Sequence, residues 1–284
     1  MAWNDTVHYP QDEMTTALLP VTTGCSYNRC AFCSMYKDDP YAVLADADIE
    51  LQLLHGRRYT ERLFLTGADP LSAGFDKMIR ILKMIRSHLP YCSCVAAYAS
   101  VKNIRMYSVD ELAILRRQGL GLLYIGFETG LDEALFQMNK GHTADDAVRQ
   151  ALKLNEAQLP FHSVVMYGIA GKGRSVENAL ATARMVNRFA TPKLITMNLT
   201  VFYGTPLEDM VKRGRFIPPD GAERLLELRT LLEYLEPASP MLFDTTHPTN
   251  IIQIKGTLPG QRRRLIGLVN RWMPRSCGQT PEGK

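Results

Sequence analysis

The feature that most constrains the fold of this 284-residue chain is a regular alternation between about residues 17 and 200. Short apolar runs rich in β-branched and aromatic residues, which predict buried strands, take turns with longer helical patterns. The predicted strands span Ala17–Thr22, Arg62–Thr66, Cys94–Ala99, Leu122–Phe127, Phe161–Tyr167 and Leu194–Val201. The predicted helices span Asp46–Arg57, Phe75–Leu89, Val109–Gln118, Ala144–Gln158 and Val176–Phe189. Six such alternations predict an α/β fold with a parallel sheet.

A parallel sheet of this kind is either doubly wound or an incomplete barrel, and the alternation alone leaves both open. In both cases functional groups gather on the loops that follow the strands. Two helix starts carry capping signals, because Ser108 precedes Glu111 by three residues and Thr143 precedes Asp146 likewise.

The rhythm changes after about residue 203, where Gly204-Thr205-Pro206 interrupts it. A long helix is predicted at about 221–235, followed by an irregular stretch and a last helix that ends near Trp272. We therefore expect residues 1–203 to form the main domain and residues 204–284 to form a helix-rich appendage that covers the mouth of the sheet.

Composition excludes several classes of protein. Hydrophobic residues make up 46% and charged residues 22%, which is ordinary for a globular chain and unlike a disordered one. The net charge of +4 is mild, and the basic residues Arg262–Arg264, Arg271 and Arg275 are interpreted as a solvated helix face. Without a nucleic-acid module signature, a nucleic-acid partner is not expected.

A membrane partner is not expected either, since no stretch of 18 or more apolar residues occurs. The residues Met1–Asp5 show no signal-peptide pattern, so we expect a reducing, cytoplasmic location.

Three of the six cysteines lie within nine residues, at Cys25, Cys30 and Cys33, directly after the first predicted strand. Clustered thiols in a reducing compartment favour a metal centre, and thiolates prefer zinc or iron–sulfur clusters. The loop has no His to complete a structural zinc site, whereas three thiolates on a cluster leave one iron open. The residues favour an open iron–sulfur site; structural zinc and unconnected thiols remain alternatives.

The other three cysteines are predicted to be ordinary thiols. Cys92 and Cys94 are expected to alternate in one strand, with both side chains on the same face of the sheet and packed in the core. Cys277 is assigned no role.

The cysteine loop resembles the signature of radical S-adenosylmethionine enzymes, Cys-x3-Cys-x-aromatic-Cys. Phe32 stands at the aromatic position and is implied to belong to the cofactor-binding residues, and the first spacing has one residue more than the family's. The resemblance implies that Cys25, Cys30 and Cys33 bind three irons of a 4Fe–4S cluster. The fourth iron would chelate S-adenosylmethionine through its amino and carboxylate groups.

Further segments support this resemblance, which covers about residues 17–210. The segment Leu65–Pro70 resembles the family's Gly-Gly-Glu-Pro loop, which grips the cofactor's amino group, so Gly67 and Asp69 are implied to bind it. The segments Tyr124–Gly130 and Met138–Thr143 look like the branch containing oxygen-independent coproporphyrinogen oxidases and methylthiotransferases.

In that branch Glu128 and Lys140 would contact the ribose or carboxylate of S-adenosylmethionine. The segment Met166–Gly171 is similar to the glycine-rich turn near adenine, which points to Gly168. Taken singly, these glycines are more typical of tight turns at strand ends, and only their common placement at one end of the sheet favours a cofactor site.

The resemblance implies an incomplete (β/α)6 barrel of the TIM type and an enzyme. An external one-electron reductant of the flavodoxin or ferredoxin type would drive cleavage of S-adenosylmethionine to a 5′-deoxyadenosyl radical. That radical would take a hydrogen atom from a small-molecule substrate, for which His247, Asn250 and Lys255 are candidate contacts.

Two other interpretations stay open. The chain would be a non-enzymatic iron–sulfur or zinc protein that uses the loop for stability or electron transfer, or a barrel that has kept the cluster and lost activity.

Overall fold

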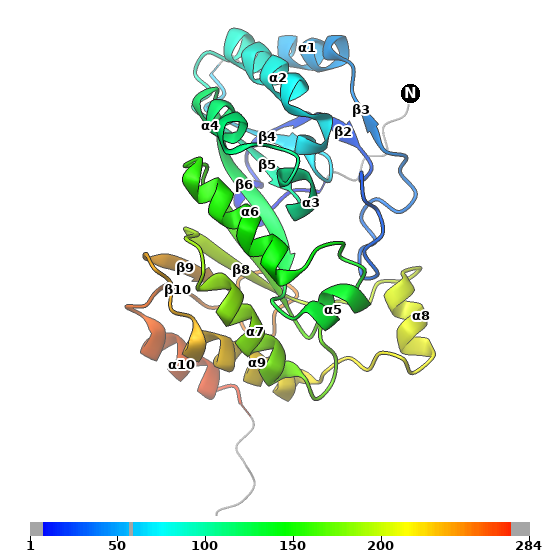
Figure 1. The fold of residues 1–284 in the computed structure, drawn as a ribbon, viewed down its shortest axis with the longest axis vertical. Helices are drawn as coiled ribbons and strands as arrows, with labels where there is room; N and C mark the ends of the chain where they lie inside the picture. Colours follow the sequence, from blue (N-terminus) through cyan, green and yellow to red (C-terminus); the bar gives the residue numbers. More distant parts are fainter. Residues whose placement is uncertain (1–7, 57–58, 274–284) are drawn as a thin grey trace, which may run out of the picture.

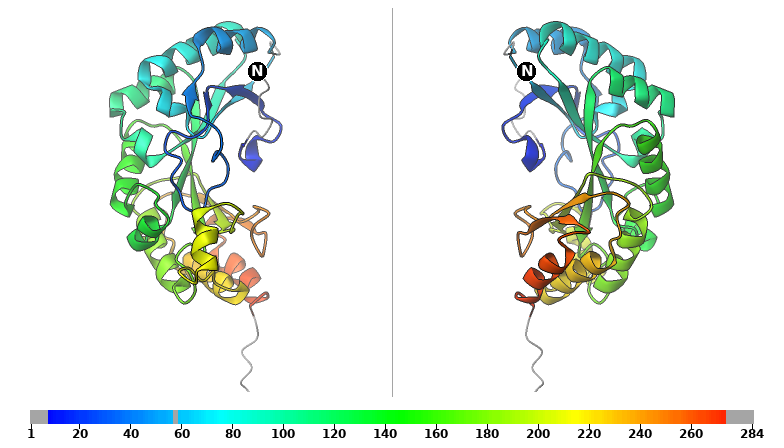
Figure 2. Two further views of the ribbon diagram at one scale, coloured as in Figure 1. Left: turned by 90° about the vertical axis from the view of Figure 1, so that its right-hand side faces the viewer. Right: turned by 90° about the vertical axis from the view of Figure 1, so that its left-hand side faces the viewer.

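In the computed structural model, which describes residues 8–56 and 59–273, one curved sheet of eight strands carries helices on its convex side (Figures 1 and 2). Its strands lie in the order β1-β4-β5-β6-β7-β8-β9-β10. Neighbours from β1 to β9 run parallel, and β10 is antiparallel to β9. The bounds are β1 Ala17–Pro20, β4 Arg62–Thr66, β5 Cys94–Ala99, β6 Leu120–Glu128, β7 Phe161–Tyr167, β8 Lys193–Asn198, β9 Met241–Asp244 and β10 Lys255–Leu258.

Helices connect the parallel strands and return the chain to the start of the next strand, as the crossover of a parallel sheet requires. The connecting helices are α1 Asp46–Leu54, α2 Phe75–His88, α3 Val101–Ile104, α4 Val109–Arg117, α5 Asp132–Gln137, α6 Ala144–Glu156, α7 Ser175–Val186, α8 Pro206–Lys212 and α9 Gly221–Tyr234. The remaining elements are η1 Gln11–Glu13, β2 Thr22–Thr23, β3 Ala42–Val43, η2 Pro70–Ala73 and α10 Arg262–Asn270.

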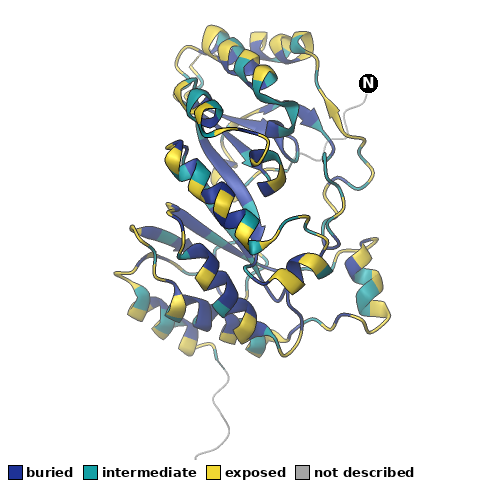
Figure 3. Ribbon diagram, viewed as in Figure 1, coloured by how far each residue is buried: buried dark blue, intermediate teal, exposed yellow. Residues whose placement is uncertain are grey.

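The two faces of the sheet bury different residues. On β4, Leu63 and Leu65 join the large core that includes Met78, Ile81 and other residues of the covering helices. Phe64, which alternates with them, belongs to a separate cluster on the inner face. The helices are buried on their inward sides and exposed outward (Figure 3). This is the pattern of a barrel wall, with a helical outer layer and a side-chain-lined interior.

The predicted α/β fold and incomplete barrel are confirmed. In the described residues β1 and β10 are the two edges of the sheet and do not pair with each other, so the barrel is open. The predicted strands Arg62–Thr66, Cys94–Ala99 and Phe161–Tyr167 coincide with β4, β5 and β7. The first predicted strand is divided, because Val21 lies between β1 and the small antiparallel pair of β2 with β3.

The segment after residue 203 was expected to be a helix-rich appendage, but it also contributes strands to the sheet. It supplies β9, a seventh parallel strand that pairs with β8, and then β10. Its long helix α9 packs against α7. Residue 203 lies in the loop between β8 and α8, and a domain boundary there stays a prediction.

The prediction that Cys92 and Cys94 alternate in one strand is wrong. Strand β5 begins at Cys94, and Cys92 lies in the turn before it, where its N–H donates to the Leu89 carbonyl at 2.9 Å. Both side chains are half-buried, and Cys277 lies outside the described residues.

Two expectations about the surface can be compared with the structure. On α10, Arg263 and Arg264 are exposed, as the interpretation of a solvated helix face expects; Arg275 lies outside the described residues. None of the described helices combines the length and hydrophobicity needed to cross a lipid bilayer.

Candidate functional site

The cysteine loop runs between β2 and β3 and is held by two neighbouring helices. The N–H of Ala31 donates to the Met138 carbonyl, after α5, at 2.8 Å. The Ala31 carbonyl accepts from the N–H of Leu207, in the first turn of α8, at 2.9 Å. Figure 1 shows this loop descending to the region where α5 and α8 lie. Cys25, Cys30 and Cys33 are all half-buried.

Side chains fix the loop further. The Asn28 amide donates to the Tyr36 carbonyl at 2.8 Å, so the loop is closed on itself. The Asn139 amide donates to the Arg29 carbonyl at 3.0 Å, and the Tyr27 hydroxyl donates to the Asn139 carbonyl at 2.9 Å. The three thiols are therefore carried by a loop whose backbone is anchored on both sides.

Three residues predicted to bind the cofactor are brought together beside this loop. Lys140 Nζ lies 2.6 Å from Glu128 Oε1 and 5.7 Å from the centre of the Phe32 ring. Burial lowers the pKa of Lys140, but the charges of Glu128 and Cys30 outweigh it and raise this pKa above its usual value. Lys140 is thus a fixed positive charge next to the cysteine loop.

Glu128 is poised for a further partner. Its backbone is in the left-handed region, with φ of +66°, which is uncommon for a residue with a side chain and typical of functional sites. Its Oε2 atom is buried and has no hydrogen-bond partner in the described protein. A Cβ atom at Gly126 would lie 2.4 Å from Glu128 Oε1, so a side chain there would displace this carboxylate from its present position beside Lys140.

Gly67 and Asp69 lie on the loop after β4, where they organise the protein around the cysteine loop. A Cβ atom at Gly67 would lie 2.0 Å from Thr22 Oγ1, so this loop packs tightly on the strand that leads to the cysteines. The Asp69 carboxylate accepts from Leu71 N at 3.1 Å, Ser100 N at 2.8 Å and Asn103 Nδ2 at 2.7 Å.

Burial raises the pKa of Asp69 to about 6, although these donors oppose the shift. Asn103 also donates to Ser26 Oγ of the cysteine loop at 3.1 Å. The carboxylate therefore joins three loops, and its predicted contact with the cofactor's amino group stays a prediction.

Gly168 lies in the turn after β7, with φ of +78°. The next two residues of this turn belong to an apolar cluster that also contains Ala31 and Phe32 of the cysteine loop. The cluster therefore joins the cysteine loop to segments that follow β6, β7 and β8; its buried members are Ala31, Phe32, Leu131, Ala134, Met138, Ile169, Ala170, Ala181, Leu199, Leu207 and Phe216.

The donor set of the loop fits an iron–sulfur cluster. Burial raises the pKa of the Cys30 and Cys33 thiols while Lys140 lowers it, so a cationic centre is the natural partner for their thiolates. In the described part of the chain no three His, Cys, Asp or Glu side chains converge as the ligands of one metal ion do. A cluster asks only for one thiolate at each of three irons.

His142 is a residue of this site that the motif contained but that sequence reasoning did not single out. Burial lowers its pKa to about 3, and the charge of Lys140 adds to this, so the imidazole is neutral. Its Nε2 atom is buried without a hydrogen-bond partner in the described protein. Its position two residues after Lys140 was the available signal.

The predicted substrate contacts lie in the loop between β9 and β10 and at the first residue of β10, and they have protein partners. Asn250 donates to the Thr196 and Thr245 carbonyls at 2.7 and 2.9 Å. Lys255 Nζ lies 3.2 Å from Asp244 Oδ2, and His247 Nδ1 lies 2.9 Å from the Thr249 hydroxyl. Their role toward a substrate stays a prediction.

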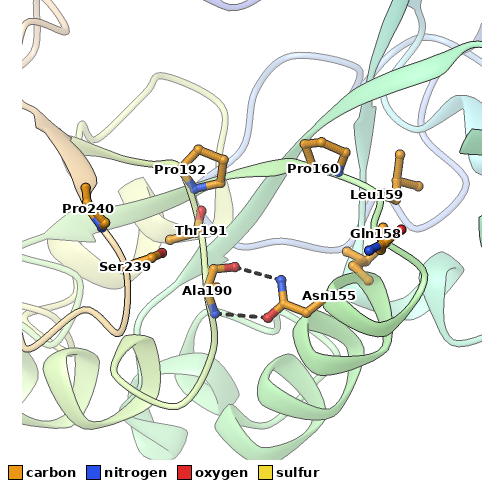
Figure 4. A pocket seen from close by; sticks show the side chains of 10 residues that line it. Asn155, Gln158, Leu159, Pro160, Ala190, Thr191, Pro192, Ser239 and Pro240 are labelled. Carbon is orange, nitrogen blue, oxygen red and sulfur yellow. Dashed lines mark hydrogen bonds between the residues drawn. The ribbon is translucent and has the colours of Figure 1, made fainter.

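A groove of about 290 Å³ lies at the opposite end of the sheet, next to residues that precede β7, β8 and β9 (Figure 4). Asn155 is one of its lining residues. Its Nδ2 donates to the Ala190 carbonyl at 2.8 Å, and its Oδ1 accepts from the Ala190 N–H at 2.9 Å. Its lining residues carry no charge; they are Leu154, Asn155, Gln158, Leu159, Pro160, Ala190, Thr191, Pro192, Ser239 and Pro240. This uncharged groove is therefore not part of the site at the cysteine loop, which lies at the other end of the sheet.

Comparisons with curated proteins point to one family. The chain is 24% identical over 204 residues to the heme chaperone HemW of Bacillus subtilis (strain 168), covering 70% of this chain and 52% of that protein. It is 28% identical over 240 residues to the mitochondrial radical S-adenosyl methionine domain-containing protein 1 of Mus musculus, covering 78% and 52%. The chain thus spans about half the length of these curated relatives.

Solved structures share the fold. Methylornithine synthase (PylB) superimposes with a TM-score of 0.57 at 16% identity, over 80% of this chain and 63% of that one. Coproporphyrinogen III oxidase (HemN) from Escherichia coli gives 0.56 at 17% identity, over 78% and 52%. At this identity the likeness concerns the fold.

The profile of the Radical SAM superfamily matches residues 19–174, more than half of the chain. The matched region contains the cysteine loop, the Glu128–Lys140 pair and the Gly168 turn. The chain belongs to the radical SAM superfamily, a family that uses a 4Fe–4S cluster and S-adenosylmethionine.

Proposed function

We propose that this chain is a radical SAM enzyme in which Cys25, Cys30 and Cys33 hold the cluster and the mouth of the barrel binds S-adenosylmethionine. One observation carries this proposal. A buried ion pair, Glu128 with Lys140, lies beside the cysteine loop and keeps one carboxylate oxygen without a protein partner. A buried acceptor of this kind costs free energy unless a ligand donates to it.

When bound, the cluster and S-adenosylmethionine supply a 5′-deoxyadenosyl radical that takes a hydrogen atom from the substrate. The residues of the chain bind and orient these groups. Glu128 Oε2 accepts a hydrogen bond from a hydroxyl or amino group of the cofactor, and Lys140 balances the negative charge of the thiolates. Phe32 and the apolar cluster around it exclude water from the loop.

The substrate of this reaction is proposed to be a small molecule that enters the concave face of the sheet. On that face Phe64, Tyr98 and Tyr124 contact one another edge to face with ring centres 5.3 to 6.2 Å apart. Phe64 and Tyr124 are fully buried, so of these three the half-buried Tyr98 is the one proposed to contact a substrate. The electron would come from an external flavodoxin or ferredoxin in a reducing, cytoplasmic environment, which also keeps the three thiols free to bind iron.

The experiment is to reconstitute the chain with iron and sulfide without oxygen, reduce it and add S-adenosylmethionine. The proposal predicts 5′-deoxyadenosine from the wild-type chain and from Cys92→Ser, and none from Cys30→Ser. Cys92 is a matched control because it is also a half-buried thiol but lies outside the cysteine loop.

The non-enzymatic alternative predicts a different result. A chain that uses the loop for stability or electron transfer would bind iron or zinc and release no 5′-deoxyadenosine in any variant. That outcome would overturn the proposed function.

A further inference from the structure

The glycine-rich turn after β7 is held by a segment far away in the sequence. The N–H of Gly168 donates to Glu227 Oε2 at 2.9 Å, and the N–H of Gly173 donates to Glu223 Oε1 at 2.8 Å. Between them, the N–H of Lys172 donates to the Ile217 carbonyl at 2.8 Å. Three backbone donors of one turn thus end on α9 and on the residues that lead into it.

The same segment packs against the turn without any spare room. A Cβ atom at Gly168 would lie 3.0 Å from Pro219 Cγ and 3.2 Å from the guanidinium of Arg224. With φ of +78°, this position already disfavours a side chain. Arg224 is fixed in turn, because its Nη1 donates to Asn198 Oδ1 at 3.2 Å and to the Leu199 carbonyl at 3.1 Å.

Glu227 continues beyond the turn into a buried chain of hydrogen bonds. It is only 1% exposed, and its Oε1 atom accepts from Asn178 Nδ2 at 2.5 Å. Asn178 Oδ1 accepts from the hydroxyl of Thr129, the residue after Glu128. The Thr129 hydroxyl in turn accepts from the N–H of Leu131 at 2.9 Å. Asn178 and Thr129 are also buried, so this connection is screened from water.

We infer that Glu227 is a positioning residue that sets the Gly168 turn and the Glu128 loop at a fixed distance from each other for S-adenosylmethionine. Its Oε2 atom accepts directly from the Gly168 N–H. Its Oε1 atom accepts from Asn178, which connects through Thr129 to the Glu128 loop, residues 128–131. The inference rests on the proposed function for its ligand. It also gives the segment after residue 203 a role in the cofactor site itself.

The chemistry of the network explains why a carboxylate is needed. The Gly168 N–H and the Asn178 amide both donate, so the side chain between them must accept twice. A glutamine has one acceptor oxygen, and its NH2 group would face a donor. Glu227→Gln therefore keeps the size of the side chain and breaks one of the two connections.

The test compares Glu227→Gln with Glu233→Gln, the same change on the same helix. Glu233 is a matched control because it pairs with Arg229 at 2.9 Å and is not part of the turn. After anoxic reconstitution, the dissociation constant for S-adenosylmethionine is measured by equilibrium dialysis. We expect about a tenfold increase for Glu227→Gln, the size of one lost hydrogen bond to a charged group, and no change for Glu233→Gln.

Two further readouts separate positioning from general stability. Iron content and the turnover rate at saturating S-adenosylmethionine are expected to stay near wild type while the KM rises. Without any cofactor, amide hydrogen exchange is expected to speed up in Glu227→Gln at residues 168–173 and 129–131 and to stay unchanged at β4.

If Glu227→Gln does not fold, Glu223→Ala replaces it, because the Glu223 side chain is half-buried and its carboxylate accepts from the Gly173 N–H, a bond that alanine removes. It is expected to raise the dissociation constant by a smaller factor of about three and to leave residues 129–131 unchanged. Wild-type affinity and wild-type exchange in Glu227→Gln would overturn the inference. A wild-type chain that binds no S-adenosylmethionine would instead overturn the proposed function.

Discussion

Glu128 and Lys140 form the pair on which the site depends. They come from the end of β6 and from the loop after α5, twelve residues apart, and they meet at 2.6 Å in the interior. Both side chains are largely buried, at 7% exposure for Glu128 and 16% for Lys140. A charge taken out of water in this way is tolerated only with its partner in place.

Replacing Lys140 with methionine therefore leaves an unpaired buried carboxylate. We expect Lys140→Met to lower the free energy of unfolding by about 3–5 kcal/mol, measured by denaturant titration of the chain without added cofactors. The double variant Glu128→Gln/Lys140→Met should recover most of this loss. Equal stability of the single and double variants would contradict the assignment of a coupled pair.

The resemblance of the sequence motifs to the radical SAM family pointed to Glu128 and Lys140. It did not predict the hydrogen bonds that Asp69 makes. Two partners of Asp69, the Ser100 N–H and the Asn103 amide, lie more than thirty residues further along the chain. Glu227 likewise meets Gly168 across 59 residues. Such contacts follow from how β5, α7 and α9 pack, and a motif in a single sequence carries no signal for them.

Among the secondary-structure elements, α8 directly supports the cysteine loop, together with the residues that follow α5. Thr205 caps this helix by accepting from the N–H of Glu208 at 3.3 Å, and its hydroxyl donates to the Phe202 carbonyl at 2.7 Å. The first turn of α8 then supplies the Leu207 N–H that holds Ala31.

Loss of this cap should loosen the support of the loop. We expect Thr205→Ala to cost about 1 kcal/mol of unfolding free energy and to speed amide exchange at residues 206–208. Thr205→Ser keeps the hydroxyl and serves as the control. Identical exchange in the alanine and serine variants would show that the cap does not hold α8.

Capping residues in the sequence predicted where single helices begin. The caps at Ser108 and Thr143 are both present, each as a reciprocal capping box with the acidic residue three positions later. Strand β9 was missed because it is only four residues long and stands in a stretch rich in Pro, His and Thr. Its place beside β8 comes from the sheet, which continues past the last predicted strand.

At the scale of the whole molecule, the segment before β1 closes the concave face of the sheet at the end opposite the cysteine loop. Glu13 of η1 is fully buried and accepts from Arg62 of β4 at 2.5 Å and from the Tyr124 hydroxyl of β6 at 2.8 Å. Asp12 lies 2.7 Å from Lys193 of β8. One short turn thus ties together strands from both halves of the sheet.

This arrangement predicts that Glu13 contributes to the stability of the whole barrel. Glu13→Ala leaves two donors on the inner face without their acceptor, so we expect a loss of about 2 kcal/mol in chemical unfolding. Glu133→Ala, at an exposed position on α5, should change stability by less than about 0.5 kcal/mol. An equal effect of both substitutions would contradict a role of η1 in closing the sheet.

The order of the first six parallel strands follows from their succession along the chain, because each helical crossover leads to the neighbouring strand. The contact of η1 with the interior could not be predicted, since Gln11–Glu13 precedes the first periodic segment and resembles a solvated terminus. The three-cysteine spacing indicated a metal centre. The buried Glu128–Lys140 pair next to it, with its Oε2 atom unpartnered in the described protein, is visible only in the structure and indicates that a second ligand binds beside that centre.

The most direct test of the central claim is the electron paramagnetic resonance spectrum of the anoxically reconstituted, reduced chain before and after addition of S-adenosylmethionine. If Cys25, Cys30 and Cys33 leave one iron open for the cofactor, the spectrum of a reduced 4Fe–4S cluster should be present and should change on addition. Cys92→Ser should behave in the same way. A colourless chain with one zinc per molecule, or a cluster spectrum that S-adenosylmethionine leaves unchanged, would contradict the claim.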